Sequence, residues 1–315
     1  MRRRSFARLL LALAFVLFAS ASLAGCREKS PAPPLPPSSA TEAPVLVVKL
    51  LDVGQGEAIL IRTREQTVLV DTGDVREGQK LRERLNSEGV ETIDKLIITH
   101  PHRDHLGGAP VVFRTYRVRS VYDNGQGTKQ KLYINYRKAI EKRGLPYRAL
   151  SDGDVLDLGG GATLHVLSPT RRMVDADGKS GEKPDLNLNS IVARLDCGAF
   201  RMLLTSDATA ETEAGLLLRH GASALRAEVL KAPHHGSRTS SGALFLKAVS
   251  PAVAVISCGA DNEYHLPHTS VRRAYQKLGA DYYRTDRNGT ITVETDGRGY
   301  TVRPERGEKN DMTEN

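Results

Sequence analysis

Three histidines and one aspartate fall within six consecutive positions, in the segment HPHRDH that begins at His100. Alternate side chains of an extended segment point to the same side, which places His100 and His102 together. Two imidazoles so placed can chelate one ion, at about 2.0–2.1 Å for zinc. Asp104 and His105 follow at the expected start of a helix and can reach a second ion. Carboxylate and imidazole ligands together suit Zn²⁺ or Mn²⁺, so the segment predicts a site for one or two divalent ions.

Each of these residues has a simpler explanation when taken alone. A single histidine is more often a surface or capping residue, and Asp104 could cap the helix that follows it. The density of the cluster is what favours metal binding, because no packing requirement explains it. Further candidate ligands follow other apolar strands, namely Asp207 and the pair His234 and His235. The hypothesis therefore requires distant segments to converge on one pocket.

The segments that carry these residues read as strands with helices between them. Strands are predicted at 45–53, 58–62, 67–70, 95–99, 118–122, 190–196, 200–204, 228–231 and 252–257, with a hairpin at 155–167. Helices are predicted at 80–87, 130–142, 209–219, 242–249 and 269–278. A polar surface loop is expected over 171–184, and a closing hairpin at Asn288-Gly289. This order favours an α/β fold in which helices cover sheets, and it leaves open whether there are one or two sheets.

Several motifs resemble those of the metallo-β-lactamase superfamily. THPHRDHLGG resembles its H-x-H-x-D-H signature, and LLDVGQGEAILI and VLVDTG resemble its opening strands. LLTSDA resembles its Gly-Asp motif, with Ser206 in place of the glycine, and LKAPHHGS resembles its later histidine motif. The resemblance implies a four-layer αββα sandwich with metals at one edge. The combination of LDVGQG, PHHGS and SCGADNEYHLPH is similar to the soluble domain of the ComEC DNA-uptake (competence) family, although no second long apolar stretch that could form a channel is evident.

The resemblance also implies roles for individual residues. His100 and His102 would bind the first ion, Asp104 and His105 the second, and Asp207 would bridge both. One histidine of the pair completes the second site; His234 is preferred, with His235 as an alternative ligand or a substrate contact. The superfamily often has one more histidine before the Asp motif, and here Asn189 is expected in that place, with His165 structural.

Other candidates surround this set. Asp71 either hydrogen-bonds a ligand histidine or starts the turn at Gly73. Lys231 could neutralise a phosphate or be solvated, and Ser237 could donate to a phosphate or cap a helix. His268 could contact substrate, act as an acid, or only precede a helix. Asp104, Lys231 and His268 are thus the candidate catalytic residues.

These assignments predict a hydrolase that uses a metal-bound hydroxide. Phosphodiester hydrolysis, with extracytoplasmic DNA as substrate, is the leading hypothesis because of the ComEC-like motifs. A small ester, lactone, β-lactam or thioester is the alternative substrate, because a fold does not specify its substrate. A non-enzymatic accessory protein that binds nucleic acid during uptake is the third possibility.

The N-terminal region has the composition of a secretory signal. Arg2, Arg3 and Arg4 precede an apolar run and the sequence Leu-Ala-Gly-Cys, which resembles a bacterial lipobox. We expect a lipoprotein signal peptide over 1–25, acylation of Cys26, and a membrane lipoprotein at the cell envelope. An ordinary cleaved signal or an uncleaved anchor is the alternative. A proline-rich linker is expected over 26–44, the folded domain over 45–303 and a polar tail over 304–315.

Charge and cysteine content narrow the remaining choices. The chain has 45 Lys+Arg and 37 Asp+Glu, a formal charge of +8 that falls to +4 without the four signal arginines. Such mild basicity permits a polyanionic substrate without requiring one. Cys197 and Cys258 could pair in an oxidising compartment, but both lie in apolar runs, which favours buried thiols.

Overall fold

The computed structural model describes residues 44–179 and 185–312, which belong to one compact unit within Pro33–Asn315. The expected signal peptide, Cys26 and nearly all of the expected linker lie outside the described residues. Among the described residues, no helix combines the length and the apolar character needed to cross a membrane.

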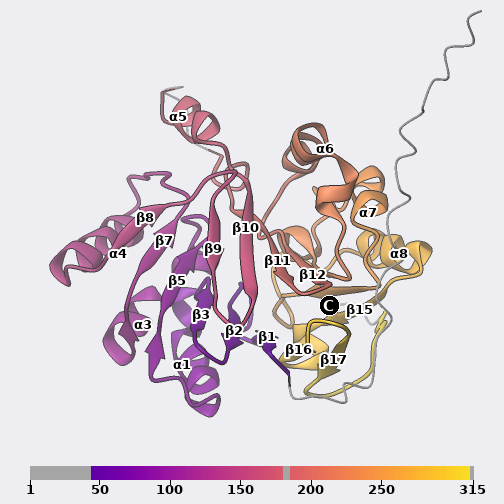
Figure 1. Ribbon diagram of the computed structural model, residues 1–315, viewed down its shortest axis with the longest axis horizontal. Coiled ribbons are helices and arrows are strands. Elements are labelled where there is room, and N and C mark those ends of the chain that lie inside the picture. The colour runs from indigo at the N-terminus through magenta and orange to yellow at the C-terminus, as the bar shows by residue number, and fades with distance from the viewer. Residues whose placement is uncertain (1–43, 180–184, 313–315) are drawn as a thin grey trace, which may run out of the picture. The chain divides into compact units, whose positions relative to one another are not determined.

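Eight of the described strands form the first sheet (Figure 1). In sheet order they are β17 (Tyr300–Pro304), β16 (Ile291–Thr295), β1 (Leu46–Leu50), β2 (Ile59–Thr63), β3 (Thr67–Val70), β5 (Lys95–Ile98), β7 (Val121–Asp123) and β8 (Tyr147–Ala149). Pairing is antiparallel from β17 to β3 and parallel from β3 to β8. The chain's first described strand, β1, therefore lies inside the sheet beside β16, a strand from its far end.

Seven described strands form the second sheet. Their order is β15 (Asp281–Arg284), β14 (Val253–Ile256), β13 (Val229–Lys231), β12 (Phe200–Leu204), β11 (Val192–Cys197), β10 (Ala162–Ser168) and β9 (Val155–Asp157). The pairs from β9 to β12 are antiparallel and those from β12 to β15 are parallel. A separate small ribbon pairs β4 (Thr92–Ile93) with β6 (Arg117–Val118).

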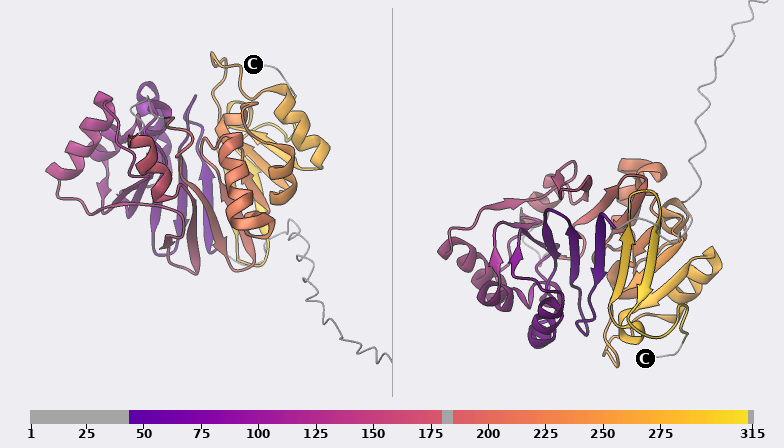
Figure 2. Two further views of the ribbon diagram at one scale, coloured as in Figure 1. Left: turned by 90° about the horizontal axis from the view of Figure 1, so that it is seen from above. Right: turned by 60° about the horizontal axis from the view of Figure 1, so that its bottom comes forward.

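The two sheets pack face to face, with helices on both outer faces (Figure 2). Alternation along β1 turns Leu46, Val48 and Leu50 toward the second sheet, where they join one core with residues such as Leu195 and Met202. The first sheet's outer face packs on α1 (Gly78–Ser87), α3 (Ala109–Thr115) and α4 (Lys131–Lys142). The second packs on α6 (Ala210–Leu225), α7 (Ala243–Val249) and α8 (Thr269–Leu278). The four-layer αββα sandwich predicted from the motifs is confirmed.

Two local predictions were wrong. The expected polar loop begins with a helix, α5 (Arg171–Lys179), whose start is capped where Thr170 Oγ1 accepts a hydrogen bond from the backbone amide of Met173, at 3.2 Å. The expected hairpin at Asn288-Gly289 is instead a crossing between sheets, because β15 pairs in the second sheet and β16 in the first. A short helix, α9 (Thr285–Asn288), makes that crossing. Asn-Gly indicates a turn, but it does not indicate which strands the turn joins.

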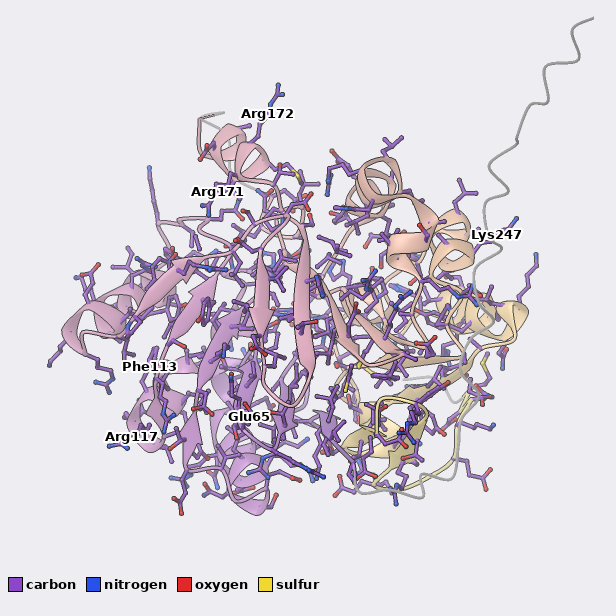
Figure 3. All side chains as sticks on the ribbon, viewed as in Figure 1. Glu65, Phe113, Arg117, Arg171, Arg172 and Lys247 are labelled. Carbon is purple, nitrogen blue, oxygen red and sulfur yellow. The ribbon has the colours of Figure 1, made fainter. Side chains whose placement is uncertain are left out.

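The described cysteines and the C-terminal segment are both integrated into the fold. Cys197 and Cys258 are buried free thiols, as expected. Residues 309–312 lie against β15, where the Asn310 amide donates to the Tyr282 carbonyl at 2.8 Å and Met312 packs on the outer core. Arg171 and Arg172 lie on α5 and Lys247 lies on α7 (Figure 3).

Replacing a side chain of the middle layer should destabilise the whole domain. Phe200 is fully buried between the sheets, 5.4 Å from Tyr300 between ring centroids. We expect Phe200→Ala to lower the free energy of unfolding by about 3–5 kcal/mol in urea titrations, because it leaves a cavity. Leu218→Ala is the control, since that side chain is 88% exposed and should change the value by less than about 0.5 kcal/mol. Equal effects of the two variants would contradict this description of the core.

Candidate metal centre

The candidate ligands meet where strands from both sheets end. Asp71 follows β3 and His100 follows Thr99 at the end of β5, so the two parallel strands deliver them to one edge. Asp207 and His234 follow β12 and β13 in the second sheet in the same way. A hydrogen bond joins these strand ends of the two sheets directly, because Ser206 Oγ donates to Thr99 Oγ1 at 2.7 Å.

The first cluster contains His100, His102 and Asp207. His100 Nε2 lies 2.9 Å from His102 Nδ1 and 3.9 Å from Asp207 Oδ2. The alternation predicted from the sequence therefore brings the two imidazoles together. His100 is fully buried, whereas His102 lies at the rim.

The second cluster contains Asp104, His105, Asp207 and His235. His105 Nε2 and His235 Nε2 each lie 3.3 Å from Asp207 Oδ1. Asp104 Oδ2 lies 3.3 Å from His235 Nε2, and the Asp104 side chain is 29% exposed. Asp207 is the one residue common to the two clusters, so the structure places it where a bridging ligand would lie.

The donor set fits divalent metal ions. Asp207 Oδ1 is buried, and no described residue donates a hydrogen bond to it. A buried carboxylate oxygen without a donor is costly unless a cation neutralises it. Imidazole nitrogens face the same space, including His105 Nε2 and His235 Nε2 at 3.3 Å from each other. Lone pairs that converge in this way are satisfied by one positive ion placed between them.

Hydrogen bonds behind the imidazoles set which nitrogen faces the centre. His235 Nδ1 donates a hydrogen bond to the Ser257 carbonyl at 2.8 Å, which leaves the lone pair of Nε2 to bind a metal ion. His105 Nδ1 lies 2.7 Å from Asp71 Oδ2. Asp71 also accepts hydrogen bonds from the Thr99 amide at 2.8 Å and the Thr99 hydroxyl at 2.7 Å. Asp71 is therefore placed to orient His105, one of its two expected roles.

Burial and neighbouring charges shift the pKa values of the candidate ligands in different directions. Burial lowers the pKa of His100 well below its usual value, so this imidazole is neutral, as a ligand must be. Burial also opposes protonation of His105, but Asp207 and Asp71 outweigh burial and raise its pKa well above the ordinary value. For Asp207, burial disfavours the anion, but His235 and His105 hold its pKa well below the ordinary value.

Left-handed backbone conformations set the directions of the candidate ligand side chains. Asp71, Ser206, His234 and His235 all have left-handed backbones, with φ of 59°, 45°, 48° and 54°. Non-glycine residues adopt this region rarely, so the surrounding contacts must stabilise it. Gly56 has φ of 135°, and a Cβ there would lie 2.4 Å from the Asp104 carbonyl oxygen. Only glycine allows the chain to pass that close to the ligand turn.

The geometry favours His235 over His234, the preferred candidate from the sequence, as the ligand of the second cluster. His235 is the histidine grouped with Asp104, His105 and Asp207. His234 Nε2 instead lies 3.7 Å from Asp207 Oδ2, toward the first cluster, and its side chain is 25% exposed. The left-handed turn through both residues decides this placement, and nothing in the pair's sequence reveals it.

The expectation that Lys231 contacts substrate was wrong. Its side chain is fully buried, forms an ion pair with Glu57 and donates from Nζ to the Ser206 carbonyl at 2.9 Å. Sequence reasoning missed Glu57, which is buried near Asp71 and His105. An acidic residue in the otherwise apolar run after Gly56 is the feature that could have indicated it.

Asn187, an amide that sequence reasoning did not single out, lies beside the first cluster. Asn187 Nδ2 lies 3.4 Å from His234 Nε2. Asn189 is fully buried, and its carbonyl accepts a hydrogen bond from Asn124 Nδ2 at 2.8 Å. The two asparagines are two positions apart in a turn, where strand alternation does not decide which one faces the site.

The remaining candidates lie outside the two clusters. His268 caps the start of α8, and its Nδ1 accepts a hydrogen bond from the Arg238 amide at 3.2 Å. Ser237 Oγ contacts Thr239 Oγ1 at 3.0 Å, and Thr239 Oγ1 also lies 3.0 Å from His234 Nδ1. His165 faces outward from β10, with Nε2 3.0 Å from Thr163 Oγ1, consistent with the structural role expected for it.

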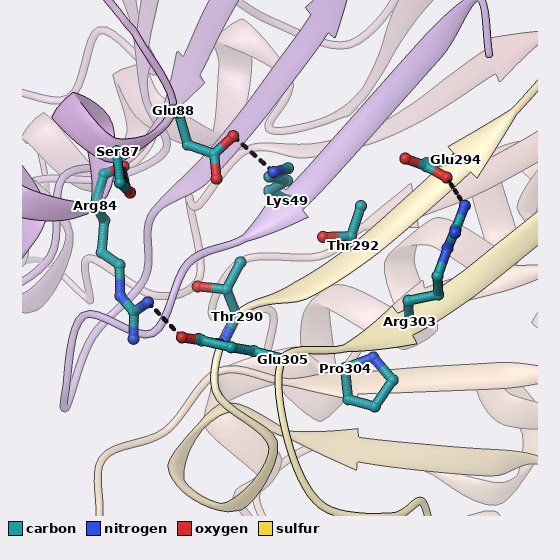
Figure 4. Close-up of a pocket in the computed structure, with 10 residues that line it drawn as sticks. All are labelled: Lys49, Arg84, Ser87, Glu88, Thr290, Thr292, Glu294, Arg303, Pro304 and Glu305. Atoms are coloured by element: carbon teal, nitrogen blue, oxygen red, sulfur yellow. Dashed lines mark hydrogen bonds and ion pairs between the residues drawn. The ribbon is translucent and has the colours of Figure 1, made fainter. Parts of the chain in front are cut away.

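A pocket of about 480 Å³ lies away from these ligands, over β1, β16 and β17 (Figure 4). Its six charged side chains form three ion pairs, Lys49 with Glu88, Arg84 with Glu305, and Arg303 with Glu294. Because these charges neutralise one another, the pocket offers no concentrated charge for a ligand.

Residues 51–260 match the sequence profile described as the metallo-beta-lactamase superfamily. The chain belongs to this superfamily. The matched range contains both ligand clusters, and members of this fold typically bind one or two divalent metal ions. Among solved structures, the diiron β-hydroxylase CmlA of Streptomyces venezuelae superposes over 81% of this chain and 55% of that protein, with a TM-score of 0.51 and 16% identity. That likeness supports the fold alone.

Competence proteins are among the sequence relatives of this superfamily member. ComE operon protein 3 of Bacillus subtilis is 31% identical over 78% of this chain and 32% of that protein. Competence protein ComA of Neisseria gonorrhoeae is 32% identical over 78% of this chain and 31% of that protein. The ComEC resemblance predicted from the motifs is confirmed, and the chain spans about a third of the length of these relatives.

Substitution of the two adjacent histidines should separate their roles. We expect His235→Ala to weaken binding of one ion by at least about tenfold, because it removes a buried donor atom. His234→Ala should leave the number of tightly bound ions unchanged. Metal content after equilibrium dialysis measures both effects, with His165→Ala as a control on the outer face of β10. Equal losses in the His234 and His235 variants would overturn this assignment.

Proposed function

We propose that this protein is a metal-dependent phosphodiesterase that acts on DNA outside the cytoplasm. The observation that carries the proposal is the pair of ligand clusters sharing Asp207, the arrangement that suits hydrolysis of a phosphate ester. The relatives named as competence proteins support DNA as the substrate. The exposed arginines Arg171 and Arg172 on α5 are available to contact a polyanion.

In this proposal, one group of residues binds the metal ions and another contacts the phosphate of the substrate. His100, His102, Asp104, His105, Asp207 and His235 would hold the ions, Zn²⁺ or Mn²⁺ by the chemistry of their ligand atoms. Divalent ions bound there would supply Lewis acidity and lower the pKa of water toward neutrality. His105 and His235 keep their Nε2 atoms directed at the centre through Asp71 and the Ser257 carbonyl.

Polar side chains at the rim would contact the phosphate. Asn187 and His234 lie beside the first cluster and can donate hydrogen bonds to phosphoryl oxygens. Because His268 Nδ1 accepts from the Arg238 amide, its Nε2 carries the proton and can donate a hydrogen bond to the leaving oxygen of the substrate. Asp104 is partly open to solvent and faces the approaching substrate.

Activity measurements on the mature domain test this function. With Zn²⁺ or Mn²⁺ supplied, we expect cleavage of bis(p-nitrophenyl) phosphate and of single- or double-stranded DNA. Chelation should abolish cleavage, refilling should restore it, and Asp207→Ala should reduce it to background. Intact DNA at full metal occupancy would overturn the proposal. Turnover of a lactone, β-lactam or thioester in the same panel would favour the alternative substrate class, and no turnover at all would favour the accessory-protein hypothesis.

We also propose that residues 1–25 direct export and that Cys26 is acylated, which would tether the domain to the cell envelope through the proline-rich linker. In bacterial cells, the wild-type protein should be recovered with membranes and should begin at an acylated Cys26, whereas Cys26→Ser should carry no acyl chain and should retain residues 1–25, as judged by intact mass. Cys197→Ser is the control, because that thiol is buried in the fold. A wild-type protein without acyl chains would overturn this proposal: the mass of a shortened chain would favour an ordinary cleaved signal, and the mass of the full chain an uncleaved anchor.

A further inference from the structure

A buried ion pair lies directly behind the metal centre. Lys231 and Glu57 are exposed by 0% and 1%, and the Lys231 ammonium contacts Glu57 Oε2. Burying two charges costs several kcal/mol per ion unless hydrogen bonds and geometry compensate. Such an ion pair need not stabilise the fold, so we look to its hydrogen bonds for its role.

Lys231 is bonded to the turn that carries the shared ligand. Its Nζ donates to the Ser206 carbonyl at 2.9 Å. Ser206 has a left-handed backbone, with φ of 45°, and directly precedes Asp207. The Ser206 carbonyl also accepts the His234 amide at 2.9 Å. One ammonium group therefore fixes the peptide that orients Asp207 and that joins it to the histidine turn.

Glu57 connects the same ammonium to the ligands of the first sheet. Its amide donates to the Asp104 carbonyl at 3.1 Å, and its carbonyl accepts the Gly73 amide at 2.7 Å. Its carboxylate lies within 4.8 Å of ligand atoms of Asp71 and His105. The pair thus links the Asp104–His105 turn to the Ser206–Asp207 turn across the two sheets.

We propose that Lys231 is a positioning residue for the metal centre and that it sets metal affinity by holding the Ser206–Asp207 turn, with Glu57 as the buried acceptor that keeps its ammonium in place. Lys231 also offsets part of the negative charge that Glu57, Asp71 and Asp207 place in the interior. The inference concerns metal binding only, so it stands or falls separately from the DNA substrate proposed above.

Metal affinity measured on three variants tests the proposal. Lys231→Met should weaken Zn²⁺ binding by roughly tenfold to a hundredfold in competition with a chromogenic chelator, as is typical when an outer partner of a ligand is removed. Glu57→Gln should change the affinity less than about threefold, because an amide oxygen can still accept from the ammonium and Lys231 still holds Ser206.

The double variant Glu57→Gln/Lys231→Met separates positioning from stability. It leaves no unpaired buried charge, so its thermal midpoint without metal should recover most of what Lys231→Met loses. Its Zn²⁺ affinity should remain low, because the Ser206 carbonyl has still lost its donor. The matched control is Arg194→Met/Asp196→Asn, which removes an ion pair on the outer face of β11, with Nε and Oδ1 at 2.7 Å. Its Zn²⁺ affinity should match wild type within about twofold.

Two results would overturn the inference. One is a double variant that folds and binds Zn²⁺ as tightly as wild type, which would make the pair a structural feature alone. The other is equal weakening of Zn²⁺ binding by the control pair, which would show that the loss follows any ion-pair removal. If Lys231→Met does not fold, the double variant still decides between these outcomes.

Discussion

The structure depends on how the buried Asp207 carboxylate is neutralised. Its Oδ1 atom has no hydrogen-bond donor among the described residues, and two imidazole nitrogens lie 3.3 Å from it. An unpaired anion at this depth would oppose folding. Several contacts bring positive charge and nitrogen lone pairs to this point. The ligand turns have left-handed backbones, Asp71 accepts hydrogen bonds from Thr99, and Lys231 donates to the Ser206 carbonyl. Binding of a divalent ion at this point would therefore be coupled to completion of the fold.

Local sequence patterns were sufficient to predict those parts of the site that depend on residues close together in the chain. The spacing of His100 and His102 predicted their convergence, because strand alternation acts over two positions. The motifs also predicted the paired sheets, since they imply the superfamily fold. Strand order could not be read in the same way: Asn288-Gly289 looks like a hairpin, yet it leads from one sheet to the other.

The differences from the sequence-based expectations share a physical cause, which is that long-range contacts decide side-chain direction in turns. His234 and His235 are adjacent, and left-handed φ values at both send their rings to different clusters. Asn187 faces the first cluster because of a turn rather than a strand. Lys231 looked solvent-accessible beside the histidines, but its partner Glu57 lies 174 positions earlier in the chain. No periodicity within one segment carries that information.

The position of β1 between β2 and β16 has a consequence for how this domain can be combined with others. The chain enters the first sheet at Leu46, opposite Thr295, and β17 is only one strand further along. A folded unit whose first and last strands are separated by one strand of the same sheet can be joined to other polypeptide at either end without opening its interior. The competence relatives, in which the matching region is about a third of a longer chain, show this kind of modular reuse.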